Sequence, residues 1–142
     1  MPVEYLILPD LEVTYVKYYG HVSTPQIELA FDVHQTDDDF RPGRSEFADL
    51  SLVADFEMDF AGVKSHFERM ENAYWENAAA TYTAIFAPRP EQASLAYAYA
   101  KLSNGSQILH AQVFEEASEA LCALGLEISA REFFEQVAED VE

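Results

Sequence analysis

The first twenty residues contain two short, largely apolar segments, and within residues 13–19 the side chains alternate between two faces. Residues 3–8 and 11–19 are rich in β-branched and aromatic side chains, which favour β-strands. Pro9 and Asp10 between them are typical of a tight turn. We therefore expect an N-terminal β-hairpin whose second strand ends at Gly20.

Apolar residues then recur at helical spacing in two longer segments. Thr24 is suited to cap a first helix, with Pro25 at its first helical position. A second helix is expected from about Asp59, because apolar residues follow at spacings of four, three and four. Its predicted buried face consists of Val63, Phe67, Met70 and Tyr74.

The remaining segments continue the alternation of strands and helices. Strands that alternate with helices of this length are typical of an α/β fold. We predict a mixed five-stranded sheet, an N-terminal hairpin followed by mostly parallel strands, with four to five helices. The further strands are predicted over 45–52, 81–87 and 107–114, and the further helices over 91–102, 115–125 and 128–141.

The length of 142 residues suits a single domain. Residues 1–126 are predicted to form it, and residues 127–142 to add an amphipathic helix that packs on the domain or on a partner. Ser129 and Glu132 have the spacing of a capping box at the start of that helix. Its apolar face supplies the candidate dimer contacts, which are Phe133, Phe134 and Val137.

The charge of the chain argues against several classes of partner. The formal net charge is −18, with eight Lys and Arg in total, so nucleic acid and anionic membrane surfaces are not expected partners. No apolar run approaches the roughly 20 residues of a membrane span. The N-terminus also lacks the features of a signal peptide, so we expect a cytoplasmic protein. Cys122 is expected to be an inert core residue.

The acidic stretch DDDFRPGRSEFADLSLVADFEMDF, residues 37–60, does not match a calcium-binding loop. Counted from Asp37, the sixth residue is Pro42 and the twelfth is Ala48, where an EF-hand requires Gly and Glu. We interpret the adjacent aspartates as a solvated loop. Asp59 is expected to cap the following helix.

Arg41 and Arg44 in the same loop allow two interpretations. Beside three aspartates they are suited to local ion pairs that order the loop. Alternatively, their guanidinium groups contact an anion or a carboxylate at the edge of the sheet.

The sequence lacks known catalytic signatures. The four histidines have neither HxxxH nor HxH spacing, and phosphate-binding glycine motifs are absent. Ser51, His21 and Asp49 could be combined into a triad, but no GxSxG motif supports it. We therefore predict no catalytic, metal-binding or cofactor-binding residue, and rank an enzyme third among the functional hypotheses.

The segment ADLSLVADFEMDFAGVKSHF resembles the STAS fold of bacterial anti-sigma-factor antagonists. In both, a strand ends in Asp-Leu-Ser and Asp-x-x-Gly opens a helix. Residues from about 11 to 126 also resemble small bacterial proteins with a STAS-like (SpoIIAA-like) fold. The motifs that carry this likeness are YVKYYGHVS, DDDFRPG, FADLSLV, TAIFAPR, LAYAYAKL and QVFEEASEALCALGL.

The resemblance implies a site at the start of the second predicted helix. In the anti-sigma-factor antagonists a Ser there, in a pattern like Asp-Ser-Ser-Gly, accepts a phosphate. The matching residues here are Asp59, Phe60, Ala61 and Gly62, so both Ser positions lack a hydroxyl. Phe60 and Ala61 instead suit a packed first turn, and phosphorylation at this site is not expected.

Two further functional hypotheses follow. The first is a non-enzymatic module that recognises an unidentified protein partner. The second is a protein that binds a small apolar ligand or lipid between sheet and helices, in a pocket lined by Tyr, Phe and Met. The candidate interaction surface comprises Asp38, Arg41, Arg44, Asp49, Ser51, Asp59 and Gly62.

Overall fold

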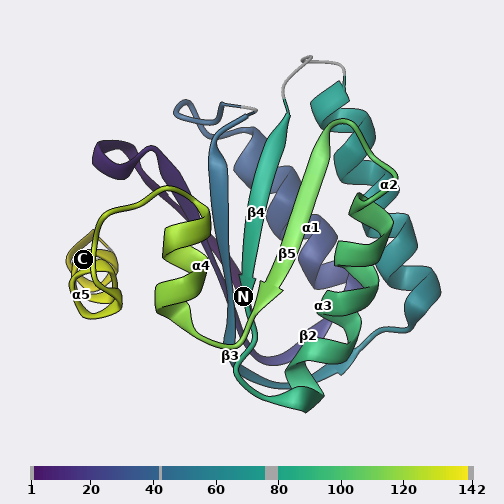
Figure 1. Ribbon diagram of the computed structural model, residues 1–142. Coiled ribbons are helices and arrows are strands. Elements are labelled where there is room, and N and C mark those ends of the chain that lie inside the picture. The colour runs from purple at the N-terminus through teal and green to yellow at the C-terminus, as the bar shows by residue number, and fades with distance from the viewer. Residues whose placement is uncertain (1, 42, 76–79, 141–142) are drawn as a thin grey trace.

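The computed structural model describes residues 2–41, 43–75 and 80–140. The described residues form the predicted α/β fold (Figure 1). The strands are β1 (Val3–Leu8), β2 (Val13–Ser23), β3 (Ser45–Glu57), β4 (Thr81–Phe86) and β5 (Leu109–Phe114). The helices are α1 (Thr24–Gln35), α2 (Phe60–Trp75), α3 (Pro90–Ser103), α4 (Ala117–Ala123) and α5 (Ala130–Asp140), with a 3₁₀ turn at Pro9–Leu11.

The five strands lie in the sheet in chain order, β1-β2-β3-β4-β5. β1 and β2 form the predicted antiparallel hairpin, and all later neighbours are parallel. Parallel neighbours need a crossover, and successive crossovers of one hand place their helices on one face. Accordingly α1, α2 and α3 cover one face of the sheet, whereas α4 and α5 lie on the other (Figure 1).

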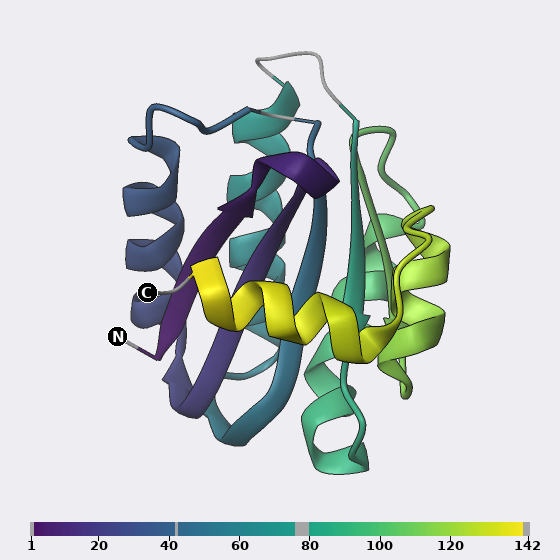
Figure 2. The ribbon, with the colours of Figure 1, turned by 90° about the vertical axis from the view of Figure 1, so that its left-hand side faces the viewer.

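The helix α5 packs on the chain's own sheet. Figure 2 shows it lying crosswise over the N-terminal strands. Phe133 is 0% exposed, and its ring centre lies 5.0 Å from that of Phe47 and 6.0 Å from that of Tyr15. The apolar face of α5 is therefore covered by side chains from residues 1–126 of the same chain.

Two strands are longer than predicted. β2 continues past Gly20 to Ser23, because Gly20 adopts a φ of 67° at a register shift that bends the strand without ending it. β3 continues to Glu57, which pairs with Ser23. Because β2 and β3 both continue, the backbone groups of each strand end find hydrogen-bond partners on the other strand. The local sequence pattern does not reveal this pairing.

Two local predictions are wrong. Ser23, not Thr24, is the N-cap of α1, and its backbone N–H donates to the Gln26 side chain at 2.9 Å. Cys122 is exposed on α4 and not buried in a core. The short helix α4 buries only its other side, through Ala120 and Leu121.

Candidate functional site

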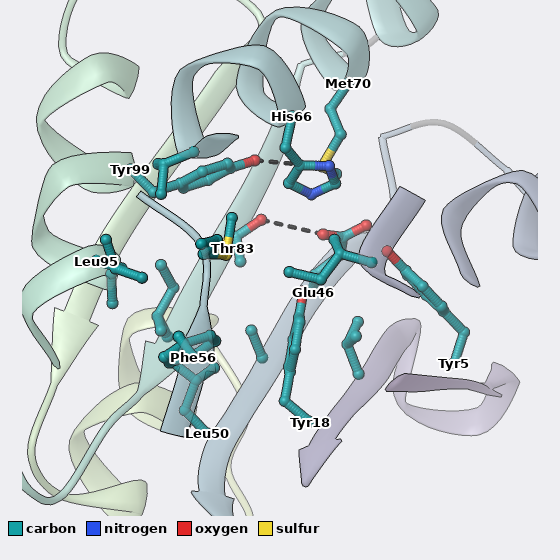
Figure 3. Close-up of a pocket in the computed structure, with 17 residues that line it drawn as sticks. Tyr5, Tyr18, Glu46, Leu50, Phe56, His66, Met70, Thr83, Leu95 and Tyr99 are labelled. Carbon is teal, nitrogen blue, oxygen red and sulfur yellow. Dashed lines mark hydrogen bonds between the residues drawn. The ribbon is translucent and has the colours of Figure 1, made fainter. Parts of the chain in front are cut away.

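A cavity of about 80 Å³, partly open to the outside, lies between the sheet and the helices α1, α2 and α3. Its walls are mostly apolar, but six lining side chains carry polar groups (Figure 3). These polar residues are Tyr5, Tyr18, Glu46, His66, Thr83 and Tyr99.

Strand alternation explains how β3 contributes to the cavity. Glu46, Ala48 and Leu50 point to the face covered by α1–α3 and line the cavity. The residue between the first two, Phe47, points to the opposite face and packs under α5. The strand β3 therefore contributes side chains to the cavity on one face of the sheet and to the hydrophobic core under α5 on the other.

Glu46 is the carboxyl group of the cavity, and its side chain is almost entirely removed from solvent at 5% exposure. The Tyr74 hydroxyl donates a hydrogen bond to Oε2 at 2.9 Å, and the Thr83 hydroxyl donates to Oε1 at 3.2 Å. Burial raises the pKa of Glu46 to about 7, and these two hydrogen bonds oppose that rise. Glu46 is therefore partly ionised near neutral pH.

Three tyrosines place phenol groups around Glu46. Among the described residues, the hydroxyls of Tyr5 and Tyr18 form no hydrogen bond, and that of Tyr99 lies 3.4 Å from the Met70 sulfur. Burial raises the pKa of all three phenols, so they remain neutral and able to donate.

His66 enters the cavity from α2, and Figure 3 shows its ring directed toward the Glu46 carboxyl group. It is 6% exposed, and its Nδ1 has no hydrogen-bond partner within the described part of the chain. Burial, together with the positive charge of Arg69, lowers the pKa of His66 to about 4. The imidazole is therefore neutral at physiological pH and one of its nitrogens is unpaired.

The Ser-His-Asp combination that the sequence allows but does not favour does not form. The Ser51 hydroxyl donates to Asp49 at 2.6 Å, but His21 instead contacts Asp55 and, at 3.0 Å, Glu57. Hydrogen bonding to Glu57 and to Asp55 raises the pKa of this exposed histidine.

Asp49 and Ser51 lie on the sheet face opposite the cavity. There they line a wider hollow of about 550 Å³ together with Phe134 and Val137 from α5. The Tyr15 hydroxyl donates to Asp49, so this carboxylate already has two hydroxyl partners. The structure thus brings Asp49 and Ser51 of the predicted interaction surface next to Phe134 and Val137 of the predicted dimer contact. The polar groups of Asp49 and Ser51 already have hydrogen-bond partners.

Asp59 caps α2 as predicted, since it accepts a hydrogen bond from the Gly62 N–H at 2.9 Å. A Cβ atom on Gly62 would lie 2.7 Å from the Thr24 hydroxyl, so glycine allows close approach to α1. The expectation of a packed first turn is wrong, because Phe60 is 53% exposed and Ala61 is also exposed.

The predicted loop residues lie at the other end of β3. Arg44 is buried and donates to the Asp39 backbone carbonyl at 2.8 Å, so within the described part of the chain it orders the loop through this hydrogen bond and not through the expected ion pair. Its Nε has no partner among the described residues. Arg41 is exposed and lies 3.7 Å from Glu12, and Asp38 is exposed. The seven residues predicted as one interaction surface are thus distributed over three places; Pro42 of the same loop lies outside the described residues.

The described residues contain neither a metal-binding cluster nor a membrane-spanning helix. They hold no group of three or more His, Cys, Asp and Glu placed to bind a metal ion. Of their helices, none has the length and apolarity needed to cross a membrane.

The fold and the cavity define an α/β protein with a mostly apolar pocket, between sheet and helices, that holds a buried carboxyl group. No protein-family model matches the sequence, and no curated protein is significantly similar to it. The resemblance to the STAS fold therefore stays a prediction.

Proposed function

We propose that this protein binds a small, mostly apolar molecule in the cavity between the sheet and α1–α3. The observation that supports this function is an apolar cavity with unpaired polar groups in its wall. Protein interiors are normally close-packed, and their buried polar groups are normally hydrogen-bonded. Here the buried Nδ1 of His66 has no partner among the described residues. The hydroxyls of the half-buried Tyr5 and Tyr18 form no hydrogen bond within the same part of the chain.

The arrangement has the composition expected of a ligand site. Such sites combine apolar and aromatic walls with a few polar groups that orient the ligand. The volume of about 80 Å³ exceeds the roughly 10–15 Å³ that one water molecule needs. Phe56, Met58 and Leu95 supply apolar wall, and Glu46 and His66 the polar end. We further propose that the protein acts in the cytoplasm.

Filling the cavity tests this function. We expect Ala48→Leu to abolish binding of small aromatic fragments in ligand-observed NMR, because Ala48 lines the cavity. The matched control is Ala84→Leu, since Ala84 is a buried strand alanine in the core on the opposite face. Both variants overpack a core, so both lose stability, but only the first should lose binding. Equal fragment binding by Ala48→Leu and the wild type would refute the proposal.

A protein-interaction function is the second candidate. The exposed first turn of α2 favours it, because Phe60 offers a large apolar side chain to solvent next to the Asp59 cap. The resemblance to anti-sigma-factor antagonists points to this same turn. It would act without a phosphorylated hydroxyl at Phe60 or Ala61.

A further inference from the structure

We propose that the ligand is an organic amine whose ammonium group pairs with Glu46 and whose apolar part fills the rest of the cavity. This inference rests on the proposed binding function and adds the chemical class of the ligand. It follows from the charges, the aromatic wall and the unpaired acceptor in the cavity.

The first argument is the missing countercharge of Glu46. Among the described residues that line the cavity, none is Lys or Arg, and Glu46 receives its two hydrogen bonds from neutral hydroxyls. A buried carboxylate without a cationic partner is costly. An ammonium group would supply the countercharge together with three hydrogen-bond donors.

The second argument is the wall around the carboxyl group. Tyr5, Tyr18 and Tyr99 line the cavity beside Glu46, and Phe56 lines it further along (Figure 3). Aromatic rings attract cations through their negative faces, most strongly where water is excluded. The cavity thus combines a carboxylate with aromatic side chains, as cation sites do.

The third argument is His66. A protonated imidazole would repel a cation, but burial keeps this ring neutral. In the tautomer protonated at Nε2, its buried and unpaired Nδ1 is a hydrogen-bond acceptor in the cavity wall.

Other ligand charges fit less well. A carboxylate or phosphate would meet the negative charge of Glu46 without a basic residue among the described cavity residues. A neutral alcohol could use the same hydrogen-bonding groups, but it would leave the carboxylate without a countercharge. The net charge of −18 also favours the approach of cations over anions.

The test compares three molecules that share one apolar group: benzylamine, benzyl alcohol and benzoate. We expect the wild type at pH 8 to bind the amine at least about tenfold more tightly than the alcohol, as one ion pair in a buried site would give. Benzoate should not bind measurably. Isothermal titration calorimetry or ligand-observed NMR gives the three affinities.

Two variants locate the effect. Glu46→Gln keeps the shape of the side chain and should weaken amine binding at least about tenfold, while alcohol binding changes by less than about threefold. Glu57→Gln removes one negative charge from an exposed strand end and should change neither affinity.

A pH series on the wild type provides a measurement that needs no variant. Amine affinity should rise from pH 5 and level off above about pH 7, as Glu46 ionises. Glu46→Gln should show no such rise. The other titratable groups that face Glu46 from β1, β2, α2 and α3 are Tyr5, Tyr18, His66, Tyr74 and Tyr99, and none changes charge between pH 5 and 8.

The possible results separate the two proposals. Three results would each overturn the amine inference. The wild type binds amine and alcohol with equal affinity, Glu46→Gln binds the amine as tightly as the wild type does, or none of the three molecules binds. If the alcohol binds and Ala48→Leu abolishes that binding, the proposed ligand-binding function still stands. If Ala48→Leu leaves fragment binding intact, the binding function itself fails.

Discussion

The buried side chain of Glu46 lowers the free energy of unfolding of the protein at neutral pH. Its pKa is about 7 in the folded protein, against an ordinary value of 4.5. Between these two pH values the unfolded chain has lost the proton that the folded protein still holds. The free energy of unfolding therefore contains a contribution that falls as pH rises from about 4.5 to 7, and that stays low above pH 7.

Glu46→Gln should remove this contribution. The difference of about 2.5 in pKa corresponds to about 3 kcal/mol. We expect the variant to gain stability relative to the wild type by up to about this amount between pH 4 and pH 8. Urea denaturation of both proteins across this range measures the difference.

The comparison between the two proteins isolates Glu46 from other titrating groups. Burial lowers the pKa of His34 and of His66 to about 4, and these groups stabilise the fold increasingly as pH rises from about 4 to 6.5. Their contribution is present in both proteins and cancels. Parallel pH curves for variant and wild type would show that Glu46 has no raised pKa.

At the scale of the element, the start of α2 is placed by capping and not by packing. Asp59 fixes the first turn through the Gly62 N–H, and Phe60 then projects into solvent. A large apolar side chain at an exposed helix start suits contact with another protein.

Phe60→Ala tests the interaction hypothesis. We expect it to lose a partner that the wild-type protein captures from its native lysate, with a change of unfolding free energy below about 0.5 kcal/mol because the site is exposed. Quantitative co-purification compares the two. Tyr82→Ala is the matched control, since Tyr82 is a similarly exposed aromatic residue on β4. Retention of the same partners by Phe60→Ala would exclude this turn as the contact.

At the scale of the molecule, the position of α5 determines whether the chain needs a second copy. Phe133 is buried against the chain's own sheet, and Phe134 is half-buried beside Tyr15 and Phe47. The helix therefore finds its apolar partner within the chain. A homodimer that uses Phe133, Phe134 and Val137 stays a prediction.

Phe134→Asp distinguishes the two roles of this helix. Because the ring packs on the chain's own aromatic residues, we expect the variant to unfold at lower urea concentration, with a loss of roughly 2–4 kcal/mol. Size-exclusion chromatography with light scattering should give the same monomer mass for variant and wild type. A wild-type dimer that the variant converts to a stable monomer would instead place α5 in an interface.

Several features could be predicted from the sequence because they depend on local patterns. The hairpin, the alternation of later strands and helices, and the Asp59 cap each follow from side-chain types at short spacing. Element ends were predicted less well. β2 passes Gly20 because β3 continues beside it, and pairing with a distant strand leaves no local signal.

The predictions from the sequence did not name the individual polar residues of the cavity. Glu46 could have been noticed as an acid within the apolar strand segment SEFADLSL, at a position that alternation assigns to a buried face. His66 similarly lies on the buried face of α2. Sequence separation hides their meeting, because the cavity residues come from four strands and three helices.

The sequence by itself determined the class of fold, since hydrophobic periodicity specifies which segments are strands or helices and which side of each is buried. Only the tertiary structure decided which buried sides face one another. Parallel pairing sets Glu46 opposite Thr83, and the helix crossovers bring His66 and Tyr99 over them. Such contacts depend on chain reversal over tens of residues, which a local pattern cannot specify. The chemistry of the cavity is therefore a property of the folded molecule.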